Sequence, residues 1–196
     1  MITMAQKRFE MHLNPNLDGS YRIALNLAGN TEDASELVQE SALRAFRSFH
    51  TFQEGTNFRA WFYRIITNLF LEWSRKRQRE HISNEDVDVY LNNHFHNVSS
   101  HSPSPVADVI EKMDIERVHY AIHSLPEEYR IAATLYFIDD LSYQEIANIV
   151  DCPVETVRSR LHSGRRLLKK ALAPSQSSGV LSPPVHKTKN LIQSLS

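Results

Sequence analysis

The stretch that most constrains the fold of this chain is LSYQEIANIVDCPVETVRSRLHSGRRLLKKAL, residues 141–172. Ser142 and Glu145 have the spacing of a capping box, in which each side chain bonds an unpaired backbone N–H at the start of a helix. Pro153 suits the first position of a second helix, because its φ is fixed and it has no N–H to satisfy. The stretch therefore predicts a short helix, a tight turn and a second helix.

The second helix divides into two faces when its residues are placed about 100° apart. The apolar face, which we expect to pack on the first helix, carries Val154, Val157, Leu161 and Leu168. The outward face carries Glu155, Arg158, Ser159, His162, Arg165 and Lys169. Such a helix fits the DNA major groove, where Arg can bond guanine, and Arg166 and Lys170 extend the charge toward phosphates. A solvated basic surface helix is the alternative, but the capping box and turn favour a DNA-binding helix-turn-helix.

The composition mainly serves to exclude certain kinds of site and of protein. The 196 residues, 41% of them hydrophobic, allow one large or two small domains. The net charge of −1 hides clusters of acids at 32–40 and 111–128 and of bases at 75–79 and 158–170. Cys152 stands alone, which excludes an internal disulfide and a thiolate metal site. No long apolar run or leader pattern is present in the sequence, so we expect a soluble cytoplasmic protein without membrane insertion.

The N-terminal half predicts three helices. Residues 1–19 are weakly patterned and rich in turn formers, so we expect little order there. A short helix should follow and end at Gly29–Asn30. Thr31 is the expected N-cap of the next helix, whose first turn holds Glu32 and Asp33 where the helix dipole favours acids.

A short loop after Phe49 leads to a long helix from Phe58 to about Gln78. Its predicted core stripe consists of Phe58, Trp61, Phe62, Ile65, Ile66, Leu69 and Trp73. Tyr63 and Phe70 lie off that stripe, near a run of basic residues at the end of the helix. Aromatic rings beside cations suit unstacked bases of a single strand. An ordinary core with a charged C-terminus explains the pattern equally well.

Residues 80–107 have the polar composition of a linker. Their histidines, His81, His94, His96 and His101, do not form a recognisable ligand set, so we expect no metal and no cofactor. Helical spacing resumes at Asp108, and a second helix should start at Pro126, giving a four-helix unit over 108–172. Residues 173–196 are rich in Ser and Pro and are expected to be disordered.

The order of these modules resembles an extracytoplasmic-function (group IV, sigma-70 family) RNA polymerase sigma factor. The resemblance rests on DASELVQESALRAFRSF and GTNFRAWFYRIITNLFLEWSRKRQR in the first module. In the second it rests on SLPEEYRIAATLYFIDDLSYQEIANIVDCPVETVRSRLHSGRRLLKKAL. It implies an all-α fold, with region 2 at 20–79 and region 4 at 108–172. It also implies a promoter-specificity factor with no catalytic residue of its own.

The resemblance implies a role for each exposed set. The set matching the helix that docks on the polymerase clamp is Asp33, Glu36, Leu37, Gln39 and Glu40. The set matching the apparatus that captures a flipped base of the minus-10 element and its phosphates is Phe52, Asn57, Trp61, Arg64, Asn68, Arg75, Lys76, Arg77 and Arg79. The set matching the reader of the minus-35 element is Arg158, Ser159, His162, Arg165 and Lys169. Expected partners are core polymerase, through its clamp and flap, promoter DNA and an anti-sigma factor.

The sequence departs from the family pattern at two places, and two other classes of protein remain as alternatives. Ser163 stands where relatives often have a basic residue, and the tail after Ala173 is longer than a minimal member needs. The first module looks most like the subgroup paired with zinc-containing anti-sigma factors, in which case a thiol switch would belong to the partner. A stand-alone helix-turn-helix regulator leaves residues 31–79 without a role. A histidine-metal enzyme would depend on His94 and His96.

Overall fold

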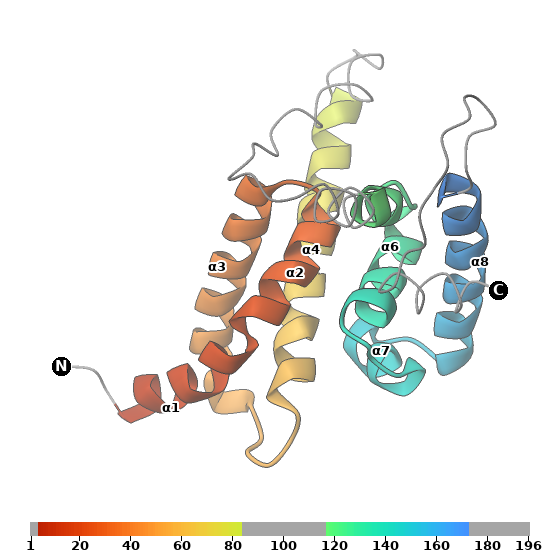
Figure 1. The fold of residues 1–196 in the computed structure, drawn as a ribbon. Helices are drawn as coiled ribbons and strands as arrows, with labels where there is room; N and C mark the ends of the chain where they lie inside the picture. Colours follow the sequence, from red (N-terminus) through yellow and green to blue (C-terminus); the bar gives the residue numbers. More distant parts are fainter. Residues whose placement is uncertain (1–3, 84–116, 173–196) are drawn as a thin grey trace, which may run out of the picture.

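The computed structural model describes residues 4–83 and 117–172, and every regular element in these two ranges is a helix (Figure 1). This confirms the expected all-α fold class. The linker assigned to 80–107 falls largely outside the described residues, as do the linker histidines His94, His96 and His101 and the tail 173–196. Within the described part, no helix is long and apolar enough to cross a bilayer.

The first module starts earlier than the sequence pattern indicates. Its elements are α1 (Met4–Leu13), η1 (Asn14–Asn16), α2 (Leu17–Ala28), α3 (Thr31–Ser48), η2 (Phe49–Thr51) and α4 (Phe58–Ser83). The weak order expected for residues 1–19 is therefore wrong from residue 4 onward. Turn formers did not prevent these helices because Phe9 is buried against aromatic rings of distant segments, which local spacing does not reveal.

The α2–α3 corner is held by two local devices. Gly29 ends α2 with φ 85°, a left-handed conformation that glycine adopts without strain. The N-cap of α3 is Asn30, whose side-chain oxygen accepts a 2.8 Å bond from the backbone N–H of Asp33. The predicted cap, Thr31, is instead the first residue of the helix. The prediction was one residue late because both residue types are good caps and only the backbone decides between them.

The second module contains a helical segment at 117–123, α6 (Glu127–Ala133), the π-helical turn η3 (Thr134–Ile138), α7 (Tyr143–Val150) and α8 (Val154–Leu172). The apolar spacing after Pro126 predicted one regular helix, whereas the structure changes to π geometry at Thr134. A π turn takes in an extra residue and so redirects the side chains that follow it. Asp139, directly after η3, is consequently turned into the molecule and buried.

Among the described residues, the larger apolar core spans both modules, and a smaller one with Ile122 and Leu168 lies within the second. The fully buried members of the larger core include Ile23, Leu27, Phe62, Ile66 and Leu69 from the first module and Leu135, Leu141, Ile146 and Ile149 from the second. Elements α6, η3 and α7 face α2 and α4, while α8 lies on the far side of the second module (Figure 1). This packing buries Tyr63 and Phe70, the two rings that the core stripe of α4 leaves out.

Polar groups also cross the boundary between the modules. Arg130 donates a 2.9 Å bond to the carbonyl of Leu27, and its guanidinium lies 5.9 Å from the centre of the Phe70 ring. His119 Nδ1 lies 2.7 Å from Asn26 Oδ1. Burial lowers the pKa of Arg130 from its ordinary value, the expected penalty for a cation removed from water. The boundary is thus an integrated part of the fold of the described residues.

The capping box at the start of α7 gives a direct stability prediction. Ser142→Ala should lower the free energy of unfolding by about 1 kcal/mol, because it removes one of the two reciprocal caps. Ser35→Ala, the same change inside α3, should alter it by less than about 0.5 kcal/mol. Urea unfolding of both variants provides the measurement, and equal losses would show that the cap is unimportant.

The same box predicts the pH dependence of that difference. Hydrogen bonds from the Ser142 hydroxyl and backbone N–H hold the pKa of Glu145 below its ordinary 4.5. A carboxyl whose pKa is lowered by folding stabilises the folded state at pH values above its ordinary pKa. This stabilisation is lost as the pH falls through the pKa of the folded state. The difference in the free energy of unfolding between wild type and Ser142→Ala should therefore become smaller below pH 4.5.

Candidate nucleic-acid interface

The helix-turn-helix forms as the sequence predicts. The Ser142 hydroxyl accepts from the Glu145 backbone N–H at 3.3 Å, and the Glu145 carboxylate accepts from the Ser142 N–H at 2.9 Å. Asp151 ends α7 in a left-handed conformation, φ 53°, and Pro153 directly precedes α8. The turn is therefore fixed by backbone geometry at both of its ends.

Three of the four residues predicted for the packing face of α8, Val157, Leu161 and Leu168, are fully buried, whereas Val154 is half-buried. Gly164 is also buried, and a Cβ placed there would lie 3.7 Å from the Cβ of Tyr129. The sequence analysis did not assign a role to this glycine. It lets α8 approach α6 closely, and its position in line with Val157, Leu161 and Leu168 was the available signal.

The outward face of α8 is open, although several of its side chains have partners within the chain. Arg158, Ser159, His162 and Lys169 are exposed. Arg158 Nη1 lies 2.7 and 2.6 Å from the two carboxylate oxygens of Glu155. An exposed pair of this kind is weak, so it holds the guanidinium at the surface without preventing an exchange for a base or phosphate.

Arg165 is the member of this set that differs. Its guanidinium lies 5.1 Å from the centre of the Tyr136 ring and 5.8 Å from that of Phe137, and the side chain is half-buried. Cation–π contact fixes it against η3 rather than leaving it free on the helix face. To reach DNA, Arg165 would have to leave these rings.

An aromatic cluster supports the predicted base-capture loop. Phe52 is buried and lies 5.3 Å from Phe58 and 5.4 Å from Trp61, measured between ring centres. His12 of α1 stacks on Phe58 with centres 5.3 Å apart. The sequence analysis did not find this contribution of α1. Phe52 is thus a supporting ring, while Trp61 is only half-buried.

The exposed edge of α4 carries the polar members of the minus-10 set. Asn57 is exposed, and its side-chain oxygen accepts from the Ala60 N–H at 3.1 Å, which caps the helix. Arg64 and Asn68 are exposed one turn apart on the same side. Arg64 lies 3.1 Å from the carboxylate of Asp151, so the turn of the helix-turn-helix meets this edge.

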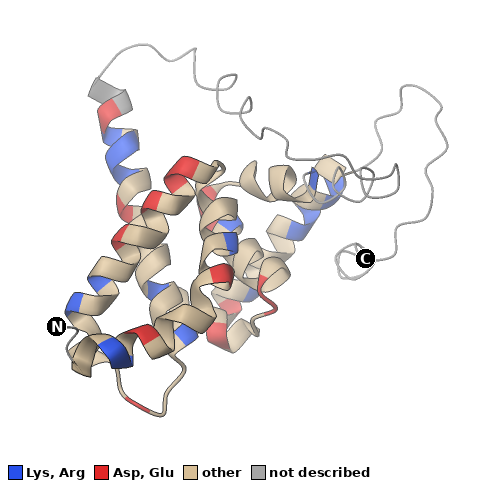
Figure 2. Cartoon of the chain, turned by 60° about the vertical axis from the view of Figure 1, so that its left-hand side comes forward, with Lys and Arg blue, Asp and Glu red and all other residues tan. Residues whose placement is uncertain are grey.

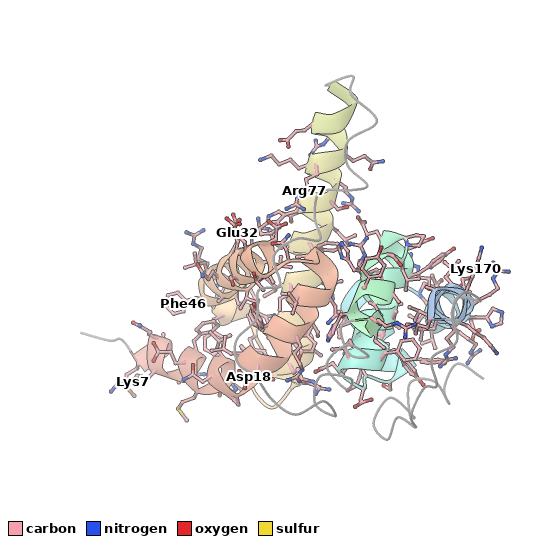
Figure 3. The ribbon with its side chains drawn as sticks, turned by 45° about the horizontal axis from the view of Figure 1, so that its top comes forward. Lys7, Asp18, Glu32, Phe46, Arg77 and Lys170 are labelled. Atoms are coloured by element: carbon pink, nitrogen blue, oxygen red, sulfur yellow. The ribbon has the colours of Figure 1, made fainter. Side chains whose placement is uncertain are left out.

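The basic end of α4 extends beyond the other helices, as the blue bands in Figure 2 show. Arg75, Lys76, Arg77 and Arg79 are all exposed there. Arg77 lies 2.8 Å from Asp33 of α3, and Lys76 lies 3.8 Å from Glu80. Figure 3 places Arg77 close to Glu32 at the start of α3. The cations are thus partly neutralised but accessible.

The residues on α3 that are predicted to dock on polymerase fall into three kinds, and we call their exposed side the predicted docking face. Glu36 and Gln39 are exposed, whereas Leu37 is fully buried and can only support the helix from within. Glu40 pairs with Arg44 at 3.0 Å, and Arg44 reaches Glu72 of α4 at 2.7 Å. Bonds to Glu72 and Glu40 raise the pKa of Arg44 above its ordinary value. Arg44 therefore ties the predicted docking face to α4.

Side chains of the types that ligate metal ions are scattered over the described ranges 4–83 and 117–172. No group of three or more His, Cys, Asp or Glu side chains there is arranged to hold a metal ion.

A cavity of about 430 Å³, lined mainly by the aromatic side chains of Phe46, Phe49, His50 and Phe52, borders the predicted base-capture loop.

Two family profiles match the chain. Sigma-70 region 2 matches residues 13–80, and Sigma-70 region 4 matches residues 115–168. The chain is 38% identical over 160 residues to the ECF RNA polymerase sigma factor SigE of Mycolicibacterium smegmatis, covering 82% of this chain and 60% of that protein. It is 34% identical over 147 residues to the ECF RNA polymerase sigma-E factor of Haemophilus influenzae, covering 72% of this chain and 76% of that one.

A solved structure is also similar. It is the sigma factor RpoE of Bartonella quintana in complex with the anti-sigma factor NepR, with a TM-score of 0.71 and 25% sequence identity. The match covers 87% of this chain and 99% of that one. The similarity thus extends through both modules.

The pairing of Arg158 with Glu155 predicts a gain of affinity. Glu155→Gln should tighten binding to duplex DNA about two- to fivefold at low salt, because an exposed ion pair and a charge facing the phosphates are both removed. Fluorescence anisotropy measures this. Glu36→Gln, an equal charge change on α3, should have little effect, and weaker binding by Glu155→Gln would contradict the assigned face.

Proposed function

The chain belongs to the extracytoplasmic-function sigma factors, and on that premise we propose that its α8 reads the minus-35 duplex while its first module captures the opened minus-10 strand. Both modules would act when bound to core RNA polymerase. The observation that carries the proposal is the presence in one chain of two exposed surfaces with polar and basic side chains on different helices, α4 and α8.

Support for minus-35 reading comes from the outward face of α8. Arg158 and Ser159 lie exposed on one turn and His162 on the next, where a helix in the major groove presents side chains to base edges. Lys169 lies further along the same exposed side and suits a phosphate. Arg165 would strengthen the contact only after leaving Tyr136 and Phe137.

Support for minus-10 capture comes from the start and edge of α4. Trp61 presents a half-buried ring beside a rigid aromatic cluster, and Asn68 and Arg64 present polar groups on the open edge. A flipped base needs a stacking surface and hydrogen-bonding groups in this relation. Arg75, Lys76 and Arg77 supply charges for phosphates further along the helix.

Support for polymerase docking comes from Glu36 and Gln39 on the open side of α3, with Asp33 and Glu40 held beside them by ion pairs. The role needs no catalytic group in this chain, because nucleotidyl transfer belongs to polymerase. It also requires the compartment in which polymerase and promoters meet, the cytoplasm. An anti-sigma partner is a further proposal, supported by the complex that the Bartonella protein forms.

Run-off transcription tests the function directly. Purified core polymerase alone should give no promoter-dependent product, and addition of this chain should produce a defined transcript. A stand-alone regulator would bind duplex DNA but leave core polymerase inactive on such a template. That outcome would reject the proposal.

Arg158→Ala should reduce transcription from a minus-35-dependent promoter by roughly fivefold or more, since a lost base contact costs about 1–3 kcal/mol. Arg158→Lys is the matched variant, because it keeps the charge but loses bidentate bonding to guanine. It should retain binding to unrelated DNA while losing promoter preference. Normal promoter choice by both variants would remove Arg158 from the reading set.

Asn68→Ala should impair strand opening more than it impairs polymerase binding, because the side chain is exposed one turn from Arg64 and two turns from Trp61 along α4. Permanganate reactivity of minus-10 thymines should fall roughly fivefold or more if one base contact is lost. Gln78→Ala, exposed on the same helix, is the control and should melt the promoter normally. Equal reactivity in both variants would exclude Asn68 from base capture.

A further inference from the structure

Helix α1 packs against both ends of the predicted base-capture loop, residues 52–57. His12 stacks on Phe58 with ring centres 5.3 Å apart and meets Phe52 edge to face at 5.4 Å. Phe9, three residues earlier on α1, is buried and lies 6.1 Å from Phe58. Phe52 opens the loop, and Phe58 begins α4. The loop therefore leaves and rejoins the helices against rings of α1.

The exposed tip of the loop is tied to α1 as well. Arg8 donates to the carboxylate of Glu54, 46 residues away in the sequence. Both side chains are more than half exposed, so the pair is weak by itself. Gly55, the next residue, has φ 86°, and a Cβ there would meet no atom of a more distant residue within 4 Å. The tip thus projects beyond the helix ends, as Figure 1 shows, and Arg8 holds it from the side.

The tip is a compact turn with empty space beside it. The backbone N–H and the hydroxyl of Thr56 donate to the carbonyl of Gln53 at 3.2 and 2.6 Å, which fixes the turn internally. The cavity of about 430 Å³ lies between α1, the end of α3 and the loop, and both Arg8 and Glu54 line it. Close packing therefore does not fix the turn on this side. The ion pair limits its movement instead.

The pair also changes the charge that an incoming strand meets. Glu54 carries a negative charge on the loop to which the proposed function brings a polyanion. Repulsion between this carboxylate and phosphates is smaller when a guanidinium group neutralises it. Arg8 is thus placed to favour strand binding without touching a base.

We propose, on the premise of the function above, that α1 is a brace for base capture, with Arg8 and His12 as positioning residues of the loop. The Sigma-70 region 2 profile begins to match at residue 13, where α1 ends, so the brace lies outside the matched range. His12 sets where the two ends of the loop lie, and Arg8 sets the direction of its tip. A loop held in this way loses less conformational freedom when a base enters.

The ion pair is tested by exchanging its charges in the full-length chain bound to core polymerase. Arg8→Glu should weaken binding to DNA with an already single-stranded minus-10 element about two- to fivefold. Arg8→Glu combined with Glu54→Arg keeps the net charge and should restore the affinity. Lys7→Glu makes the same charge change at the preceding exposed residue and should stay within about twofold of wild type. Fluorescence anisotropy of the labelled DNA measures all three.

The ring contacts are tested at His12. His12→Ala should weaken binding to the single-stranded element about tenfold, because it removes the contacts with both Phe52 and Phe58. His12→Phe keeps a ring at this position and should recover most of the affinity. Binding to core polymerase and to a minus-35 duplex should equal wild type in both variants, which general damage to the fold would not allow.

Hydrogen–deuterium exchange over residues 53–57 of the free chain reports on the loop itself. Exchange should be faster in Arg8→Glu and His12→Ala, because both loosen the turn, and should return to the wild-type rate in the charge-exchange variant. Lys7→Glu should exchange at the wild-type rate. Circular dichroism should show unchanged helicity in every variant.

Four outcomes would overturn the brace. Unchanged exchange in Arg8→Glu and His12→Ala would show that α1 does not hold the loop. Faster exchange with unchanged strand binding would show that loop position does not govern capture. Equal losses in Lys7→Glu and Arg8→Glu, or no recovery on charge exchange, would show that charge alone matters. A wild-type chain that binds no opened strand would instead reject the proposed function, while the exchange rates would still decide whether α1 holds the loop.

Discussion

The structure depends on the burial of two sides of α4 by two different sets of helices. Phe62, Ile66 and Leu69 are fully buried in the apolar core that both modules share, where α4 contacts α2 and α3. Tyr63 and Phe70 are buried where Asp139 and Arg130 of the second module meet α4. Only the edge with Arg64 and Asn68 and the projecting basic end remain open. The residues of α4 proposed to contact nucleic acid therefore lie where burial does not require an apolar side chain.

Features with local signals in the sequence could be predicted, whereas the burial of α4 by the second module could not. The helix-turn-helix was predictable because its signals are local: a capping box, a proline before α8 and an apolar stripe. The burial of Tyr63 was not, because its covering residue, Asp139, is remote in the sequence. Likewise α1 is fixed by contacts of Phe9 with Phe46 and Phe49. Periodicity within one helix cannot show a partner so distant.

The candidate site divides in the same way. Helical spacing correctly predicted the exposure of Arg158, Ser159 and His162, because exposure follows from the angle around the helix. It did not predict that Arg165 lies against Tyr136 and Phe137. These two rings belong to η3, whose π-helical geometry points them in directions that regular helical spacing does not give. Leu37 shows the converse: a family motif assigns it to docking, but the fold uses it as core.

The length of α4 has a consequence for promoter geometry. Trp61 and Arg77 belong to one uninterrupted helix, so their axial separation is about 24 Å at 1.5 Å per residue. That distance corresponds to about seven nucleotides at 3.4 Å each. In the proposed function, the helix would act as a rigid spacer that sets which phosphate is held when a given base is extruded. An inserted residue would turn one end about 100° relative to the other and misalign strand and cations together.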